Sequence, residues 1–279
     1  MTPCARNHGA ITRWRAPAAR RFSTVSATLG CGPVANATPV PAHRPLVLAA
    51  HGSVDPRSAA VTHAVAGRIR RLRPWLDVRA AFLEKTDPNL RDALAGLPDG
   101  VVVPFLLADA YHARVDIPEM IEQSGARVDQ AGVLGEDPAL LSVLRQRLSE
   151  IGVSPDEDGL GVVVVAVGSS NEAANARTAE VARALSAGTR WTGAEVAFAT
   201  VPSKSAPNVA DAAERLRDNG ARNLVIAPWF LAHGIITDRV ASYAAAHGIP
   251  MADPLGSHNL VAATVLDRFD ATNVVSAAA

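Results

Sequence analysis

The hydrophobic positions of this chain fall into short continuous runs, separated by longer stretches of mixed polarity. Because the runs do not alternate between apolar and polar residues, they are typical of strands covered on both faces. Helical stretches of roughly 10 to 18 residues lie between them, which indicates βαβ units and an α/β fold with parallel sheets. Six runs are predicted as strands: 46–50, 78–83, 101–106, 161–167, 195–200 and 224–227.

Three aspartate–proline pairs mark the expected starts of helices. Asp55-Pro56, Asp87-Pro88 and Asp137-Pro138 each place a carboxylate in the capping position, followed by proline at the first helical position. We therefore expect a helix to begin at each pair.

The order of these signals repeats along the chain. Gly52-Ser53 recurs as Gly168-Ser169, and Pro104 with its apolar followers recurs as Pro228. This repetition predicts two tandem α/β domains, each a three-layer α/β/α unit around a parallel sheet. The expected ranges are an extension over 1–44, a domain carrying the active site over 45–150, a linker over 151–160, a degenerate second domain over 161–270 and a tail over 271–279.

The first 44 residues contain several arginines and no acidic residue, and they show no apolar periodicity. Their composition resembles a transit peptide, and Arg20-Arg21-Phe22 resembles part of a twin-arginine signal. The residues that follow are too weakly apolar for the core of a signal peptide. We therefore expect a disordered or targeting-like extension of a cytoplasmic protein.

Charge and cysteine content exclude several classes of protein. The 27 Lys and Arg residues balance 27 Asp and Glu residues, so no global field attracts nucleic acid or an anionic membrane. The apolar runs are far shorter than the roughly 18 to 20 residues that cross a bilayer. Cys4 and Cys31 have no neighbours at metal-binding spacing. We therefore expect no nucleic-acid partner, no membrane span and no cysteine-held metal.

Three reactive side chains follow the strands of the first domain. His51 comes directly after the first predicted strand, Glu84 after the second and His112 beyond the third. Ligands of parallel sheets bind at the carboxyl ends of the strands, so these residues are expected at one rim. Two imidazoles and a carboxylate suit Fe, Co, Ni or Zn, and they also exchange protons near neutral pH.

Each of the three side chains taken alone has a structural alternative, such as a hydrogen bond to a loop carbonyl. The second half serves as an internal control, because it repeats the fold without the triad. Alignment places Val167 opposite His51 and Ile236 opposite His112, and residues 200–205 contain no carboxylate. The one-sided triad favours a single active site in the first half.

The first half resembles the sirohydrochlorin chelatase family, the class II chelatases, over about residues 46 to 148, and the second half resembles a degenerate copy. The motifs that carry the resemblance are His51-Gly52-Ser53 with Asp55-Pro56-Arg57, Phe82-Leu83-Glu84 with Pro88, Pro104-Phe105-Leu106-Leu107, His112, and Val115-Asp116-Ile117-Pro118. The resemblance implies ATP-independent insertion of cobalt or ferrous iron into a tetrapyrrole, and no phosphate-binding GxxxxGK[ST] motif occurs here. It assigns metal binding and macrocycle deprotonation to His51, Glu84 and His112, with no cofactor beyond the substrate metal.

Further residues near the rim are candidates for binding the carboxylates of such a substrate. The Gly52-Ser53 turn offers backbone N–H groups, and Arg57 and Arg114 offer guanidinium groups. A solvated surface role is the alternative for both arginines. Asp116 is expected to cap the next helix, with a hydrogen bond to His112 as the alternative.

One departure from the family pattern lies two residues before His112, where the family usually has glycine and this chain has Ala110. If that position requires positive φ or a close approach of the macrocycle, Ala110 narrows or shifts the pocket.

The main hypothesis is a lyase that places Co²⁺ or Fe²⁺ into sirohydrochlorin for cobalamin or siroheme synthesis. The alternative is a non-catalytic binding protein for metal or tetrapyrrole on the same fold. A zinc hydrolase is a third reading, but no further rim carboxylate is spaced to activate water. The sequence leaves open the metal, the pathway and the choice between monomer and homodimer.

Overall fold

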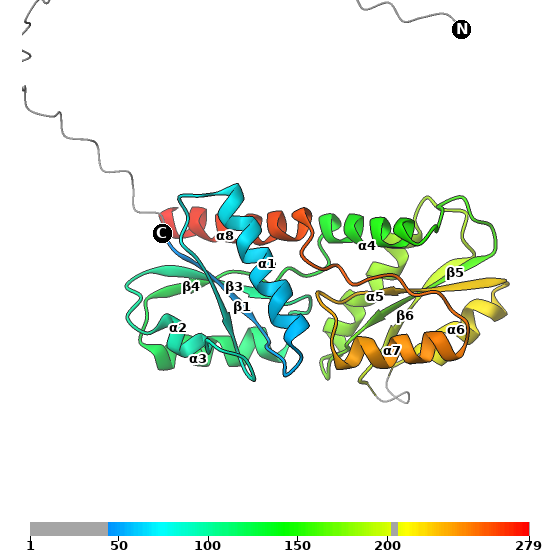
Figure 1. Cartoon of the computed structure of the whole chain (residues 1–279), viewed down its shortest axis with the longest axis horizontal. Coiled ribbons are helices and arrows are strands. Elements are labelled where there is room, and N and C mark those ends of the chain that lie inside the picture. Colours follow the sequence, from blue (N-terminus) through cyan, green and yellow to red (C-terminus); the bar gives the residue numbers. More distant parts are fainter. Residues whose placement is uncertain (1–43, 202–205, 279) are drawn as a thin grey trace, which may run out of the picture. The chain divides into compact units, whose positions relative to one another are not determined.

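The computed structural model describes residues 44–201 and 206–278. The expected N-terminal extension lies outside these residues, except for Arg44. Within them the chain forms two parallel sheets, each with helices on both faces (Figure 1). The predicted α/β class with two tandem sheets is thereby confirmed.

The first sheet has the strand order β2-β1-β3-β4, and every neighbouring pair is parallel. The strand β1 lies at its centre, so its carboxyl end opens toward the loops that follow β2 and β3. The elements of this half are β1 (Leu46–Ala50), α1 (Pro56–Leu72), β2 (Val78–Phe82), α2 (Leu90–Leu94), β3 (Gly100–Phe105), the π-helix η1 (His112–Asp116), α3 (Ile117–Ser124) and β4 (Val128–Gln130).

The second sheet has the order β6-β5-β7 and is also parallel. A single bridge between Ile226 and Met251 stands where the first sheet has its fourth strand. The elements of this half are β5 (Leu160–Ala166), α5 (Glu172–Ser186), β6 (Gly193–Phe198), α6 (Val209–Asp218), β7 (Asn223–Pro228) and α7 (Ile235–Ala246).

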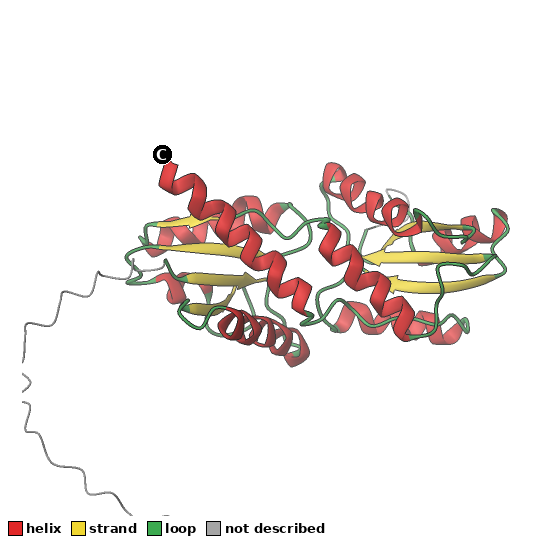
Figure 2. Cartoon of the chain, turned by 90° about the horizontal axis from the view of Figure 1, so that it is seen from above, coloured by secondary structure: helices red, strands yellow, loops and turns green. Residues whose placement is uncertain are grey.

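Two helices are exchanged between the halves. The C-terminal helix α8 (Asn259–Ala278) follows the second sheet in sequence but packs on α1 and β3 of the first half (Figures 1 and 2). The helix α4 (Pro138–Glu150) follows the first sheet but packs on α5 and β7 of the second. Each sheet is thus covered by a helix from the other half. The tail predicted over residues 271–279 is wrong for residues 271–278, because α8 continues through them.

Side chains tie these exchanged helices in place. Arg268 of α8 donates to the carbonyls of Val133 and Leu134 and to the Asp137 carboxylate. Arg73, just after α1, forms a two-pronged ion pair with Asp270 of α8. Because guanidinium pairs of this kind fix orientation as well as contact, they hold α8 in a defined register on the first half.

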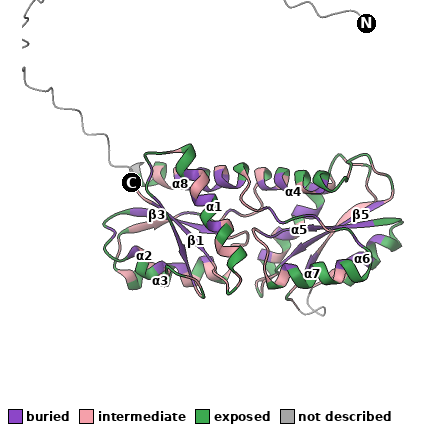
Figure 3. Ribbon diagram, in the orientation of Figure 1, coloured by how far each residue is buried: buried purple, intermediate pink, exposed green. Residues whose placement is uncertain are grey.

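One hydrophobic core runs beneath both exchanged helices. It joins buried residues of the two sheets, among them Leu48 and Val164, to Phe269 of α8. Two smaller cores fill the opposite faces, one under α2 and α3 and one under α6 and α7. The strands β1, β2, β3, β5 and β7 are buried along most of their length, which explains their continuous apolar runs (Figure 3). The strands β4 and β6 are only partly buried.

The predicted helix starts are right at two of three positions. Asp55 and Asp137 cap α1 and α4 with proline next in the chain. The start predicted at Asp87-Pro88 is wrong, because the Pro88 carbonyl accepts the Phe82 N–H at the edge of the sheet. The cap of α2 is the side chain of Asn89, which accepts from the Arg91 N–H.

The exchanged packing predicts an effect of α8 on the first half. We expect Phe269→Ala to lower the free energy of unfolding by about 3 to 5 kcal/mol, because Phe269 is 5% exposed in the shared core. Amide hydrogen exchange measured by mass spectrometry should accelerate in β3 and α1. The control Val274→Ala lies on the same helix at 70% exposure and should change stability by less than about 0.5 kcal/mol. Faster hydrogen exchange confined to β5 and β7 would contradict the packing of α8 on the first half.

Candidate active site

The three predicted site residues meet at the carboxyl edge of the first sheet. His51 follows β1, Glu84 lies two residues beyond β2, and His112 begins η1 after β3. The imidazole rings of His51 and His112 lie 4.3 Å apart between centroids and nearly perpendicular, at 89°. His51 Nδ1 lies 3.5 Å from Glu84 Oε1. The three side chains are exposed by 42% to 43%, so they are accessible to a ligand.

Both imidazoles have their Nδ1 atoms engaged. His51 Nδ1 lies 3.0 Å from the Gly52 carbonyl, and His112 Nδ1 is hydrogen-bonded to the Asp116 carboxylate. Both partners are acceptors, so each Nδ1 donates to its partner, and in the neutral imidazole each Nε2 then keeps its lone pair for a ligand. The same arrangement orients histidines that ligate metals in other proteins.

The side chains of His51, Glu84 and His112 do not form a complete metal-binding site as they lie in the structure. Among residues 44–201 and 206–278, no group of three His, Cys, Asp or Glu side chains is arranged to hold a metal ion. Glu84 Oε1 is engaged by Lys85 Nζ at 2.8 Å. Binding of a metal ion by all three residues therefore requires a rearrangement of their side chains, and the ion must compete with Lys85 for Glu84.

Gly52 positions His51 against Glu84. Its φ is +88°, and a Cβ placed there would lie 1.8 Å from the backbone carbonyl oxygen of Glu84. The Glu84 N–H in turn donates to the His51 carbonyl at 3.0 Å. Only glycine permits the two loops to approach this closely.

Thr86 closes the same pair of loops. Its hydroxyl oxygen accepts from the Ser53 N–H at 3.1 Å and donates to the Ser53 carbonyl at 2.9 Å. The Ser53 hydroxyl accepts from the Asp55 N–H. The backbone N–H of Ser53, expected to face a substrate carboxylate, is therefore already used within the protein.

The π-helix η1 determines the position of His112. The Ile117 N–H donates to the His112 carbonyl, an i to i+5 bond, and π-helical turns of this kind are frequent at functional sites. Asp116 has helical dihedral angles and makes no capping bond, so its predicted role as an N-cap is wrong. Its side chain binds His112 instead, which was the alternative.

Ala110 causes no backbone strain. Among the described residues, the one non-glycine position with positive φ is Lys85, so Ala110 does not need the left-handed conformation. The matching position in the second half is Gly234, which is extended with φ of 177°. The family glycine is therefore not required here for backbone conformation.

The carboxyl group of Glu84 has a lowered pKa. The main cause is the bond from the Lys85 ammonium group, and the nearby imidazoles of His51 and His112 lower the pKa further. Partial burial opposes this shift. Glu84 is consequently ionised at neutral pH and available as an anionic ligand.

Arg57 and Arg114 lie near the rim, and both already hold carboxylates. Arg57 binds Asp55 and reaches Asp238 at the start of α7, with contacts of 2.6 and 2.5 Å. The Arg57 guanidinium lowers the pKa of Asp55 to about 2. Arg114 forms a two-pronged pair with Asp109. The Arg57 contact joins the first half to the second at their sheet edges.

The second half repeats the loop geometry without the chemistry. Gly168 has φ of +91°, and the Thr200 N–H donates to the Val167 carbonyl, as Glu84 does to His51. Val167, 41% exposed, therefore occupies the place of His51, and Thr200 occupies that of Glu84. Ile236, half-buried, packs against the core beneath α7.

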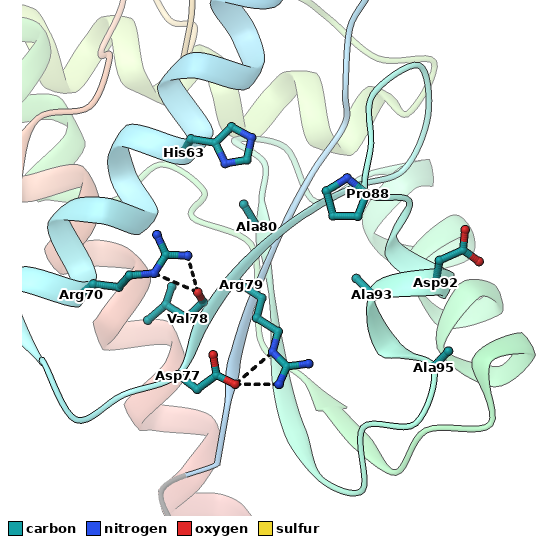
Figure 4. Close-up of a pocket in the computed structure, with 10 residues that line it drawn as sticks. All are labelled: His63, Arg70, Asp77, Val78, Arg79, Ala80, Pro88, Asp92, Ala93 and Ala95. Atoms are coloured by element: carbon teal, nitrogen blue, oxygen red, sulfur yellow. Dashed lines mark hydrogen bonds and ion pairs between the residues drawn. The ribbon is translucent and has the colours of Figure 1, made fainter.

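A groove of about 720 Å³ lies elsewhere, along the outer edge of β2. Figure 4 shows Arg70 donating to the Val78 carbonyl and Arg79 pairing with Asp77 along this groove. None of the three site residues lines it. The candidate site is thus the open rim rather than this groove.

Sequence reasoning missed three residues that contact the site. Lys85 and Thr86 follow Glu84 directly, and Asp238 reaches Arg57 from the other half. Adjacency to Glu84 was the available signal for the first two. No sequence signal marks Asp238, because its contact depends on the arrangement of the two halves.

A parallel α/β sheet with two histidines and a glutamate at its rim defines a candidate metal-handling protein. The CbiX family model matches the chain twice, over residues 45–151 and 161–272. The chain therefore belongs to this family, that of the sirohydrochlorin chelatases, and carries the family unit in duplicate. The predicted family and the predicted duplication are both confirmed.

Two curated relatives come from Priestia megaterium. Its sirohydrochlorin cobaltochelatase is 30% identical over 176 residues, which is 58% of this chain and 56% of that protein. Its sirohydrochlorin ferrochelatase is 28% identical over 185 residues, 62% of this chain and 68% of that protein. The matched part thus spans little more than half of the first relative.

Solved structures share the fold. SirB from Bacillus subtilis with Fe³⁺ superimposes with a TM-score of 0.66 at 22% identity, covering 82% of this chain and 95% of SirB. CbiX, described as the terminal enzyme of siroheme biosynthesis in denitrifying bacteria, gives 0.62 at 21% identity, covering 82% and 99%. At this identity the likeness establishes the architecture.

None of the helices in the described residues is long and apolar enough to span a bilayer.

The close approach at Gly52 leads to a direct prediction. We expect Gly52→Ala to destabilise the protein by more than about 2 kcal/mol in urea unfolding, because a Cβ would meet the Glu84 carbonyl at 1.8 Å. The control Gly96→Ala shares positive φ, at +74°, but has no atom within 4 Å of the added Cβ. It should cost about 1 kcal/mol, the backbone strain alone. Equal losses in the two variants would show that the loop contact does not matter.

Proposed function

We propose that this protein is a lyase that inserts Co²⁺ or Fe²⁺ into sirohydrochlorin or a closely related tetrapyrrole. The observation that supports this most is the pair of imidazoles that share one rim, each with Nδ1 hydrogen-bonded and Nε2 free. Family membership and the names of the curated relatives support the same substrate class. A cobalt product would serve cobalamin synthesis, and an iron product would serve siroheme synthesis.

The reaction replaces two macrocycle N–H protons by a divalent metal ion, so the site must supply both ligands and bases. In this proposal His51 Nε2, His112 Nε2 and a Glu84 oxygen hold the substrate metal. The same Nε2 atoms accept macrocycle protons once the metal has left them, because imidazole is both ligand and base near neutral pH. Asp116 stabilises the His112 imidazolium formed in that step, through its bond to Nδ1.

The peripheral carboxylates of the macrocycle are assigned to Arg57 and Arg114. A further contact at the Gly52-Ser53 turn requires the Ser53 N–H to exchange its bond with Thr86 for one with the substrate. Both guanidinium groups are about half exposed, at 47% and 57%. Each guanidinium group already binds protein carboxylates, so a substrate carboxylate must either displace these groups or bind the same guanidinium beside them. At Arg57 the displaced group is Asp238, whose side chain is 53% exposed.

The decisive experiment mixes the purified protein with sirohydrochlorin and Co²⁺ or Fe²⁺ and follows the change in absorbance. We expect catalytic turnover in the wild type and loss of metallation in His112→Ala, with the melting temperature within about 3 °C of the wild type. The control His63→Ala, an exposed imidazole on α1, should retain turnover. Stoichiometric binding without turnover would favour a carrier of metal or tetrapyrrole instead. Retained activity with a large drop in melting temperature would make His112 structural.

The Arg57 assignment has its own prediction. We expect Asp238→Asn to lower the KM for sirohydrochlorin by about three- to fivefold, with little change in kcat, because a competing carboxylate is weakened. The effect should shrink as salt concentration rises. The control Asp92→Asn removes the same charge from an exposed position on α2 and should leave KM unchanged. A raised KM in Asp238→Asn would show that the ion pair assists substrate binding rather than competing with it.

A further inference from the structure

Lys85 binds the same carboxylate oxygen that faces His51. Its Nζ lies 2.8 Å from Glu84 Oε1, and His51 Nδ1 lies 3.5 Å from that atom. An ammonium group therefore stands beside the carboxylate expected to receive a metal ion. Because like charges repel, a divalent cation and this ammonium group compete for Glu84.

The backbone holds Lys85 in this place. Its φ is +57°, and no other non-glycine residue in 44–201 and 206–278 has positive φ. Left-handed backbone is costly for lysine, and such strain persists where neighbours impose it. Here Glu84 is tied to the His51 carbonyl on one side, and Thr86 is tied to Ser53 on the other.

Transfer of a metal ion requires that the protein bind it and then release it. A positive charge beside a carboxylate weakens the attraction of that carboxylate for a divalent cation, which favours release. On the basis of the proposed function, we propose that Lys85 is a positioning residue that competes with the substrate metal for Glu84. It weakens the hold of the site on the metal and pairs again with the carboxylate as the metal leaves.

The first test measures Co²⁺ binding without any tetrapyrrole, by calorimetric titration and by the visible absorption of Co²⁺. We expect Lys85→Met to lower the Kd by about five- to tenfold and to slow Co²⁺ loss to a chelator. The control Arg91→Met removes one positive charge from nearby α2, where Arg91 faces Asp92 at 3.6 Å, and should leave the Kd unchanged. Lys85→Arg, which keeps the charge, should stay close to the wild type.

The second test measures turnover with sirohydrochlorin. Lys85→Met should lower both the KM for Co²⁺ and kcat, because tighter binding slows transfer to the macrocycle. If Lys85→Met does not fold, Lys85→Asn provides the same loss of charge, since asparagine tolerates left-handed backbone.

The outcomes separate this inference from the proposed function. An unchanged Co²⁺ Kd in the folded, neutral Lys85 variants overturns the role of Lys85, whatever the turnover. Equal tightening in Arg91→Met also overturns it, because the effect would then be general electrostatics. Tighter Co²⁺ binding in Lys85→Met, combined with no metallation by the wild type, supports the competition and overturns the chelatase function.

Discussion

The site depends on one close contact between two loops. The turn after β1 passes so near the loop after β2 that the Glu84 carbonyl occupies the space where a side chain at residue 52 would be. This contact brings His51, Glu84 and Lys85 onto one rim, and the Thr86 hydroxyl closes it from the other side. The second half keeps the positive-φ glycine, at Gly168, and the backbone bond between the two loops, but there the side chain of Val201 fills the space beside the glycine and the reactive side chains are absent.

A second constraint is the exchange of α4 and α8. Each sheet buries one face under a helix supplied by the other half, and the shared core makes the two halves one folding unit. The ion pair between Arg57 and Asp238 then connects the carboxyl edges of the two sheets. Each half therefore depends on the other to cover its sheet, even though the second half carries no triad of its own.

Much of this structure was predictable from sequence. The continuous apolar runs predicted six strands, because strands buried on both faces are apolar throughout. Ligands of parallel sheets bind at the carboxyl ends of the strands, and this rule predicted that His51, Glu84 and His112 lie together. The short strand β4 was missed, since its three residues are only partly buried and too few to show a pattern. The exchange of α8 was missed because the apolar face of a helix does not identify the sheet that it covers.

The finer geometry of the site was also beyond sequence reasoning. Asp116 before Ile117-Pro118 has the pattern of a helix cap, but a π-helix carries the chain through it and turns its carboxylate to His112. The left-handed backbone of Lys85 has no sequence signature, because lysine has no preference for it. Both features arise from tertiary contacts that override local propensity.

If the proposed site is right, the Nε2 atoms of His51 and His112 bind the same divalent ion. X-ray absorption at the cobalt edge of the Co²⁺-loaded protein tests it most directly, because imidazole ligands give a distinct outer-shell scattering pattern. We expect two imidazoles with oxygen ligands in the wild type and one imidazole after either histidine is replaced by alanine. A spectrum without imidazole, or one unchanged by both substitutions, would contradict it.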